Sequence, residues 1–143
     1  RFDYSVLGDE VNLASRLEGQ SKTYGVTIVI GDNTRQRAPE LATLELDLIR
    51  VKGKSRPVRI HTLLGDAELA RSPAFQERHS LHAQLLEAYR GCEFEHALDL
   101  THACAAAAPT LQGLYELYRT RIEDYLENPP PKDWDSVYTA RTK

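Results

Sequence analysis

The side chains best suited to chemistry in this sequence stand in the segment 4–18, YSVLGDEVNLASRLE. Asn12 and Arg16 are four residues apart, and in a helix that spacing places both on one face. An arginine presents planar, forked donors to phosphate oxygens, and an asparagine amide can orient a hydroxyl group. The pair is therefore suited to binding a polyanion. The same spacing also fits a simpler interpretation, in which Arg16 pairs with Asp9 or Glu10 on a solvated helix surface.

These side chains need a strand and a helix to position them. We expect residues 3–7 to end a strand, and a helix to follow over 9–24 because apolar residues recur there at spacings of three and four. Asp9 is the expected N-cap, and Gly25 supplies the stop signal. A continuous β-branched run over 26–30 then predicts a buried strand.

The strand expected over 41–51 alternates between an apolar and a polar face. The apolar face carries Leu44, Leu46 and Leu48. The polar face, with Glu45 and Asp47, should meet solvent in a half-buried strand. A turn over 52–55 and a returning strand over 58–64 complete a hairpin. Residues 1–65 are therefore expected to form an α+β unit.

The remainder of the chain is expected to be helical. We expect a linker over 66–73, a helical hairpin-like extension over 74–128, and a proline-rich tail over 129–143 that packs back on the body. Trp134 and Tyr138 should hold this tail in place, because an exposed tryptophan in a free tail has no stabilising role.

The cysteines and histidines form no metal-binding signature. Cys92 and Cys104 are predicted to be small apolar core residues in a reducing compartment, although in a helical hairpin the two could also face each other. His79 and His82 are three residues apart on one helix face, a spacing more typical of packing than of zinc ligation. We therefore expect no metal ligands in this segment.

Composition excludes several classes of protein. The chain has 143 residues, a net charge of −3 and ordinary globular proportions, which argues against a dedicated nucleic-acid binder. No apolar run approaches the roughly 20 residues of a transmembrane helix. The sequence contains no methionine, so we expect further protein upstream of Arg1, with processing or truncation as the alternatives.

Two blocks of this sequence resemble the class III nucleotidyl cyclase catalytic domain. The first is the segment 4–18 together with Tyr24-Gly25, and the second is VKGK at 51–54 followed by Pro57-Val58. The resemblance covers residues 1–64 and is greatest to the bacterial branch with Ser or Thr at the purine-reading position, which often contains adenylate cyclases. It implies the C-terminal half of a ferredoxin-like cyclase palm, with a βαβ unit and a hairpin.

The resemblance implies a role for each matching residue. Ser5 occupies the position that helps to read the purine of ATP, and Asn12 matches the residue that orients the ribose. Arg16 matches the arginine that stabilises charge on the transferring phosphoryl group. Lys52 matches the lysine that contacts the terminal phosphates, and nearby Lys54 is expected to assist it.

The resemblance also implies groups that this segment lacks. Two metal-binding aspartates, holding two Mg²⁺ or Mn²⁺ ions, and a purine-selecting lysine would lie before Arg1. Asp3 and Asp9 are not assigned to the metal site. In this family the active site forms between subunits of a head-to-tail homodimer, and this chain would supply the asparagine and arginine. We expect the fragment alone to be inactive.

The helical part resembles one tetratricopeptide-type hairpin, although loosely. The match rests on Tyr89, Gly91, Phe94, Ala97 and Pro109. One such hairpin cannot form a solenoid, so we expect it to pack on the sheet or on a dimer partner, and a protein-binding role stays open.

Three functions are compatible with these features. The leading hypothesis is a cytoplasmic bacterial adenylate cyclase, with an upstream sensor domain or membrane anchor left open. The alternative is a degenerate cyclase-like module that binds a nucleotide or a partner without catalysis. A stand-alone helical interaction domain is the third, and it would leave the motifs of the first half unexplained.

Overall fold

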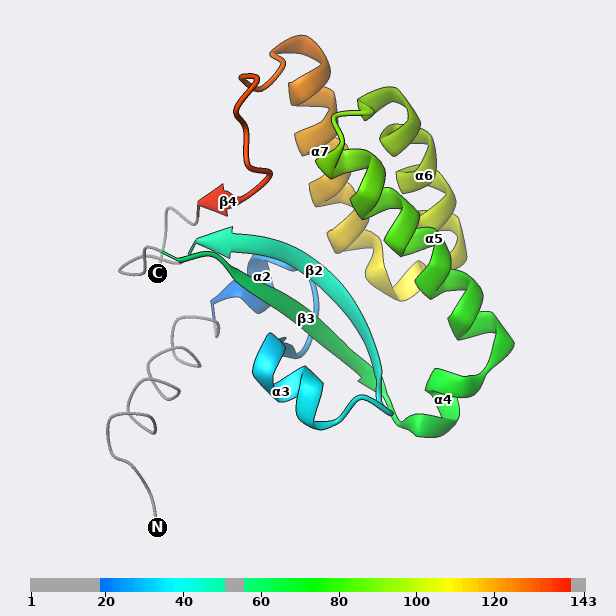
Figure 1. Cartoon of the computed structure of the whole chain (residues 1–143). Coiled ribbons are helices and arrows are strands. Elements are labelled where there is room, and N and C mark those ends of the chain that lie inside the picture. Colours follow the sequence, from blue (N-terminus) through cyan, green and yellow to red (C-terminus); the bar gives the residue numbers. More distant parts are fainter. Residues whose placement is uncertain (1–18, 51–55, 140–143) are drawn as a thin grey trace.

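The structure, a computed structural model, describes residues 19–50 and 56–139 and shows a mixed α/β fold (Figure 1). The strands are β1 (Val29–Gly31), β2 (Ala42–Arg50), β3 (Val58–Gly65) and β4 (Tyr138–Thr139). They form one sheet in the order β1-β3-β2-β4, in which β3 runs antiparallel to both neighbours and β4 runs parallel to β2. The expected α+β character and the expected hairpin of β2 and β3 are both confirmed.

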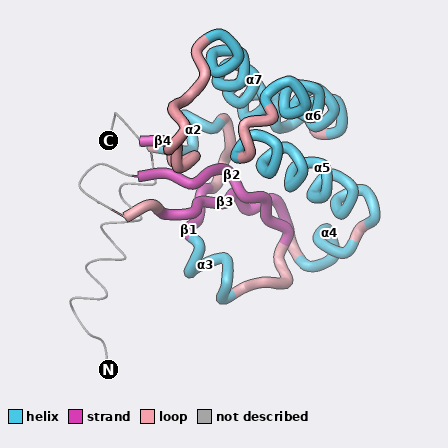
Figure 2. The backbone as a smooth tube through the Cα atoms, turned by 45° about the horizontal axis from the view of Figure 1, so that its top comes forward, coloured by secondary structure: helices cyan, strands magenta, loops and turns pink. Residues whose placement is uncertain are grey.

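Helices cover the sheet from two sides. They are α2 (Gln20–Tyr24), α3 (Asp32–Arg37), α4 (Ala67–Arg71), α5 (Pro73–Arg90), α6 (Phe94–Ala107), the 3₁₀ helix η1 (Pro109–Leu111) and α7 (Gln112–Glu127). Both views place α5, α6 and α7 together on one side of the hairpin and α3 on the other (Figures 1 and 2). Helix α4 lies inside the segment where a linker was expected.

Local signals set the ends of two helices, the first of them as predicted. Gly25 follows α2 in the left-handed conformation, with φ of 66°, and its backbone N–H caps the helix. At the start of α5 the Ser72 side chain accepts a hydrogen bond from the N–H of Phe75 at 3.2 Å, and Pro73 occupies the first turn, where it costs no hydrogen bond.

The prediction of a buried strand over 26–30 is confirmed for the strand itself but wrong for its length and its burial. The strand is β1, it covers only Val29–Gly31, and all three of its residues are half-buried. Among the described residues β1 pairs with β3 alone, so it lies at the edge of the sheet that these residues form. Ile28, just before it, is 43% exposed.

A β-bulge in β2 overturns part of the predicted alternation. Glu45 pairs with His61 and Asp47 with Ile60, which leaves Leu46 without a partner on β3. An extra residue at a bulge shifts the two-residue period of a strand by one. Asp47 is consequently fully buried, although it was predicted to meet solvent, and Leu48 is only half-buried.

The helices cover the edge of β2 that β4 leaves unpaired. Strand β4 pairs only with Ile49 and Arg50. Ahead of them, the carbonyl oxygen of Glu45 is hydrogen-bonded by His82 of α5, and that of Leu46 accepts from the Tyr118 hydroxyl of α7. These contacts satisfy backbone groups that an open edge would expose, so the helical part packs on the sheet.

Sheet and helices share one hydrophobic core. From the sheet side it contains Tyr24, Leu44, Leu46, Ile49 and Ile60, and from the helices Leu85, Tyr89, Leu114, Tyr118 and Ile122. All of these side chains are nearly or fully buried. The division near residue 65 is therefore a change of secondary structure within one continuous core.

The proline-rich segment after α7 returns to the body. Trp134 packs against Tyr89, Phe94 and Tyr125, with ring centroids between 5.0 and 6.1 Å apart. Tyr138 follows in β4 beside β2. Edge-to-face and tilted ring contacts of this kind add to the area that the rings bury.

The two cysteines differ, and the prediction for one of them is wrong. Cys104 is buried in α6, where burial raises the pKa of its thiol to about 11. Cys92 is exposed in the turn between α5 and α6, with φ of 62°. The turn needs a residue with positive φ directly after Gly91, which removes this side chain from the core.

Two glycines bring the end of α2 against the start of α7. A Cβ atom on Gly113 would lie 3.1 Å from the Cα of Gly25, and a Cβ on Gly25 would lie 2.9 Å from the Cα of Gly113. In both cases the neighbour is backbone, which cannot rotate away. The close approach therefore requires glycine at both positions.

Substituting Gly113→Ala should destabilise the protein by about 1–3 kcal/mol, because the added methyl forces two backbones apart. In an unconstrained helix the same change stabilises by about 1 kcal/mol, so the sign is diagnostic. Urea unfolding measures the difference. Thr120→Ala on the exposed face of the same helix is the control and should be near neutral. Equal or greater stability of Gly113→Ala would contradict the close approach.

Candidate functional site

The five residues expected to bind or transform a nucleotide lie outside the described residues. They are Ser5, Asn12, Arg16, Lys52 and Lys54. The structure does describe the elements that flank them. Helix α2 follows the segment 4–18 and ends at Tyr24 of the first block, and β2 and β3 stand on either side of the second.

Those flanking elements are joined by a buried hydrogen bond. The hydroxyl of Tyr24, the last residue of α2, donates to Oδ2 of Asp47 in β2 at 2.6 Å. The other carboxylate oxygen of Asp47 accepts from the N–H of Leu48 at 2.8 Å. Burial and the neighbouring carboxylate together raise the pKa of Tyr24, so its hydroxyl stays protonated and remains a donor. The helix that ends the first block is thus tied to the strand that leads to the second.

Arg121 of α7 completes this cluster. Its Nη1 lies 2.6 Å from Oδ2 of Asp47, and its Nη2 donates to the Tyr24 hydroxyl at 3.3 Å. Its guanidinium also stacks on the ring of Tyr138, with 3.9 Å from Cζ to the ring centroid. We call Tyr24, Asp47 and Arg121 the buried junction; it joins α2, β2 and α7, and β4 covers it.

The charges of the buried junction are removed from water. The side chains of Asp47 and Arg121 are only 1% and 10% exposed. Burial works to lower the pKa of Arg121, but Asp47 and the surrounding tyrosine hydroxyls together raise it overall. Removing one partner of such a pair leaves an uncompensated buried charge, which costs about 3–5 kcal/mol.

Sequence reasoning missed this junction. Its one visible signal is an arginine on the tyrosine-bearing face of the last long helix. The alternating pattern instead assigned Asp47 to solvent, since the bulge at Leu46 leaves no mark on sequence periodicity.

A second polar network joins α5 to the sheet. Glu45 accepts from Arg59 of β3 at 2.8 Å and from Arg90 of α5 at 2.6 Å. Burial alone would raise the pKa of Glu45, but the two guanidinium groups lower it overall. Beside them, His82 is buried and bonds the Glu45 carbonyl and the Tyr115 hydroxyl.

The hydrogen-bond partners of His82 determine which of its ring nitrogens carries the hydrogen. A carbonyl oxygen only accepts, so Nε2 of His82 carries the hydrogen, and in the neutral ring Nδ1 accepts from Tyr115. Burial lowers the pKa of His82 to about 4. His82 is therefore a neutral structural group at physiological pH.

This network borders a cavity of about 280 Å³ between the sheet and α5. Its lining includes His61, His79, His82, Arg35 and Arg90. His61 pairs with Asp32 at 2.8 Å, yet burial lowers its pKa. Because Glu45 and Glu87 offset Arg35 and Arg90, the cavity shows no excess of one charge sign. Within the described part of the chain, no group of three or more His, Cys, Asp or Glu side chains is arranged to hold a metal ion.

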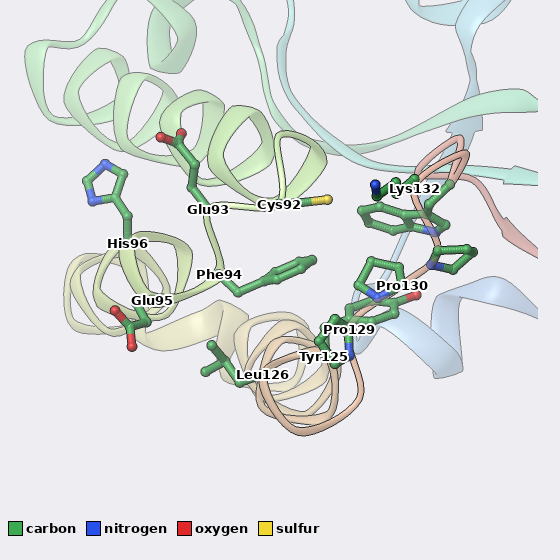
Figure 3. Close-up of a pocket in the computed structure, with 12 residues that line it drawn as sticks. Cys92, Glu93, Phe94, Glu95, His96, Tyr125, Leu126, Pro129, Pro130 and Lys132 are labelled. Atoms are coloured by element: carbon green, nitrogen blue, oxygen red, sulfur yellow. The ribbon is translucent and has the colours of Figure 1, made fainter.

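A larger groove of about 620 Å³ lies between the start of α6, the end of α7 and the proline-rich segment (Figure 3). Phe94 and Tyr125 line it from the two helices, and Pro129 and Pro130 line it from the tail. Phe94 and Tyr125 stack on each other at 5.2 Å. The rings thus bind the returning tail, and the groove is the outer margin of that contact.

Over the ranges 19–50 and 56–139, no helix is long and apolar enough to cross a membrane.

Comparison with known proteins finds partial relatives. The chain is 40% identical over 65 residues to an adenylate cyclase of Anabaena cylindrica, which covers 43% of this chain and 13% of that protein. It is 32% identical over 66 residues to adenylate cyclase 1 of Rhizobium meliloti (strain 1021), covering 46% of this chain and 10% of that protein. The aligned part thus spans about a tenth of these relatives.

No family model and no solved structure matches the chain. The two partial alignments support a relationship to adenylate cyclases at the level of the family.

The His82 network makes stability depend on pH. An unfolded histidine titrates near 6.5 and folded His82 near 4, so between these values the unfolded state binds more protons. Stability should fall as pH drops from 6.5 towards 4, by roughly 3 kcal/mol from His82 alone. His61, whose pKa is also lowered, adds in the same direction.

The test is urea unfolding of the His82→Gln variant across this pH range. Glutamine can still donate to Glu45 and accept from Tyr115, but it cannot titrate. Between pH 6.5 and 4, the His82→Gln variant should therefore lose roughly 3 kcal/mol less stability than the wild type. Exposed His102→Gln is the control and should keep the wild-type slope. An unchanged slope in His82→Gln would show that His82 does not titrate as the burial implies.

Proposed function

We propose that this chain is part of a class III adenylate cyclase, which converts ATP to cyclic AMP and pyrophosphate. The observation that carries the proposal is the similarity of about 65 residues to two adenylate cyclases. The motif residues in 4–18 and 51–54 support it, because they match the family's nucleotide-binding positions. We further propose that the sheet and its flanking helices are part of a ferredoxin-like palm.

The proposed roles follow from the chemistry of the reaction. The ribose 3′-oxygen attacks the α-phosphorus, and charge spreads over the nonbridging and leaving oxygens. Arg16 would meet the charge on the transferring group and Lys52 that on the terminal phosphates, assisted by Lys54. Fixed cations at these places stabilise the transition state more than the ground state. Asn12 would orient the ribose and Ser5 would contact the purine.

Two Mg²⁺ or Mn²⁺ ions belong to this proposal. When bound, such ions activate the attacking hydroxyl and neutralise the leaving group. We propose that two aspartates of the parent protein hold them. A head-to-tail homodimer would bring those aspartates to Asn12 and Arg16. We place the reaction in the cytoplasm because ATP is its substrate.

The helical part has a separate proposed role. The α5–α6 hairpin resembles a tetratricopeptide hairpin, yet its buried face is occupied by α7 and the sheet in this chain. We propose that it supports the catalytic part. An upstream sensor or a protein bound to the exposed helix surface would supply the regulation.

The full-length protein supplied with Mn-ATP should form cyclic AMP and pyrophosphate, measured by chromatography of the products. Arg16→Ala should lower kcat by at least 100-fold, by analogy with cationic clamps in other phosphoryl transfers. Removing one cation from the transition state affects kcat more than ATP binding.

Arg71→Ala is the matched control, because it removes an arginine that is exposed in α4 and lies outside both motif blocks. It should turn over at the wild-type rate. Wild-type turnover by Arg16→Ala would overturn the role given to Arg16, and no cyclic AMP from the wild-type protein would overturn the proposed function.

A further inference from the structure

We propose that Tyr24, Asp47 and Arg121, the buried junction, act as positioning residues through which helix α7 sets the geometry of both nucleotide-binding motif blocks. This inference rests on the proposed cyclase function. It assigns a catalytic consequence to the helical part of the chain, which neither the motifs nor the similarity to cyclases assigns.

The buried junction lies close to both motif blocks along the chain. Tyr24 ends α2, which begins at Gln20, four residues after Arg16. Asp47 lies in β2, which ends at Arg50, two residues before Lys52. The hydrogen bond of 2.6 Å between Tyr24 and Asp47 therefore joins the two elements that flank the motif blocks.

Arg121 is the member of the buried junction that comes from α7. Its two terminal nitrogens reach Asp47 and Tyr24 separately, at 2.6 and 3.3 Å. One planar guanidinium thus contacts both elements at once, and its orientation is restrained by stacking on Tyr138 at 3.9 Å. A lysine in its place would keep the charge and lose the fork.

Helices α2 and α7 are in contact at a second point. Directly after Tyr24, Gly25 meets Gly113 of α7 backbone to backbone. Arg121 stands two helical turns further along α7. Two contacts, one polar and one steric, therefore restrain α2 on α7, whereas one contact would leave it free to pivot.

The position of the proposed catalytic groups affects the rate of the reaction. Groups that stabilise a transition state must be held in the productive geometry, and a displacement of about 1 Å can cost on the order of 100-fold. Displacing α2, which follows Arg16 closely in the chain, should therefore lower kcat. It should leave the KM for ATP nearly unchanged, because much of the substrate contact comes from other residues.

The test uses the full-length protein with Mn-ATP. Tyr24→Phe removes one hydroxyl and keeps the ring, so it breaks the hydrogen bonds of α2 to both Asp47 and Arg121. We expect kcat to fall about tenfold and KM to stay within about twofold. Arg121→Lys keeps the positive charge but loses the fork that reaches both Asp47 and Tyr24, so it should also lower kcat.

A double-mutant cycle separates positioning from a general loss of structure. Arg16→Lys weakens the proposed catalytic group and leaves measurable turnover. If Tyr24 acts through Arg16, Tyr24→Phe should lower kcat little further in the Arg16→Lys background. Additive losses would overturn the inference, because they mean that the two residues act independently.

A stability control completes the design. Leu100→Ala in α6 opens a void in the helical layer and should reduce stability by at least as much as Tyr24→Phe, as urea unfolding will show. Its kcat per folded molecule should equal that of the wild type. A loss of kcat equal to that of Tyr24→Phe would mean that any destabilisation slows turnover, which overturns the inference.

The outcomes also separate this inference from the proposed function. A wild-type protein that forms no cyclic AMP overturns both. An active wild type in which Arg16→Ala abolishes turnover, while Tyr24→Phe and Arg121→Lys turn over normally, leaves the proposed function in place and overturns the positioning role alone.

Discussion

A buried carboxylate, that of Asp47, is the constraint on which the rest of this structure depends. Its side chain is 1% exposed, and a charge so far from water is tolerated only when it is paired and hydrogen-bonded. Arg121 supplies the opposite charge and Tyr24 a hydroxyl. The sheet must therefore meet both α2 and α7, and the helical part is bound to the motif-bearing part by electrostatic necessity as well as by apolar packing.

The bulge at Leu46 makes this arrangement possible. It shifts the period of β2 so that Asp47 points to the core, and the carbonyl oxygens of Glu45 and Leu46 are both taken up by helix side chains, His82 and Tyr118. Strand β4 pairs with only the last two residues of β2. Ahead of these residues, helix side chains bond the β2 backbone in place of a further strand. The sheet edge is thus covered without extending the sheet.

This architecture gives the proposed cyclase function a structural setting. In a reaction that is driven by fixed positive charges, the protein's task is to keep those charges in place. The helix end after the first motif block and the strand end before the second converge on one buried junction. The helical part, which has no catalytic side chain in the proposed mechanism, then contributes rigidity to the elements that carry them.

Features with local causes were predictable from sequence. Gly25 ended a helix because only a left-handed residue fits there, Ser72 and Pro73 began one, and β2 and β3 formed the expected hairpin; the motif residues also pointed to a cyclase before any comparison did. The burial of Asp47, its partner Arg121 and the exposure of Cys92 were decided by tertiary structure. Arg121 lies 74 residues from Asp47 in the sequence. Periodicity and capping describe neighbours along the chain, whereas the pairing of a buried charge depends on which distant element folds against it.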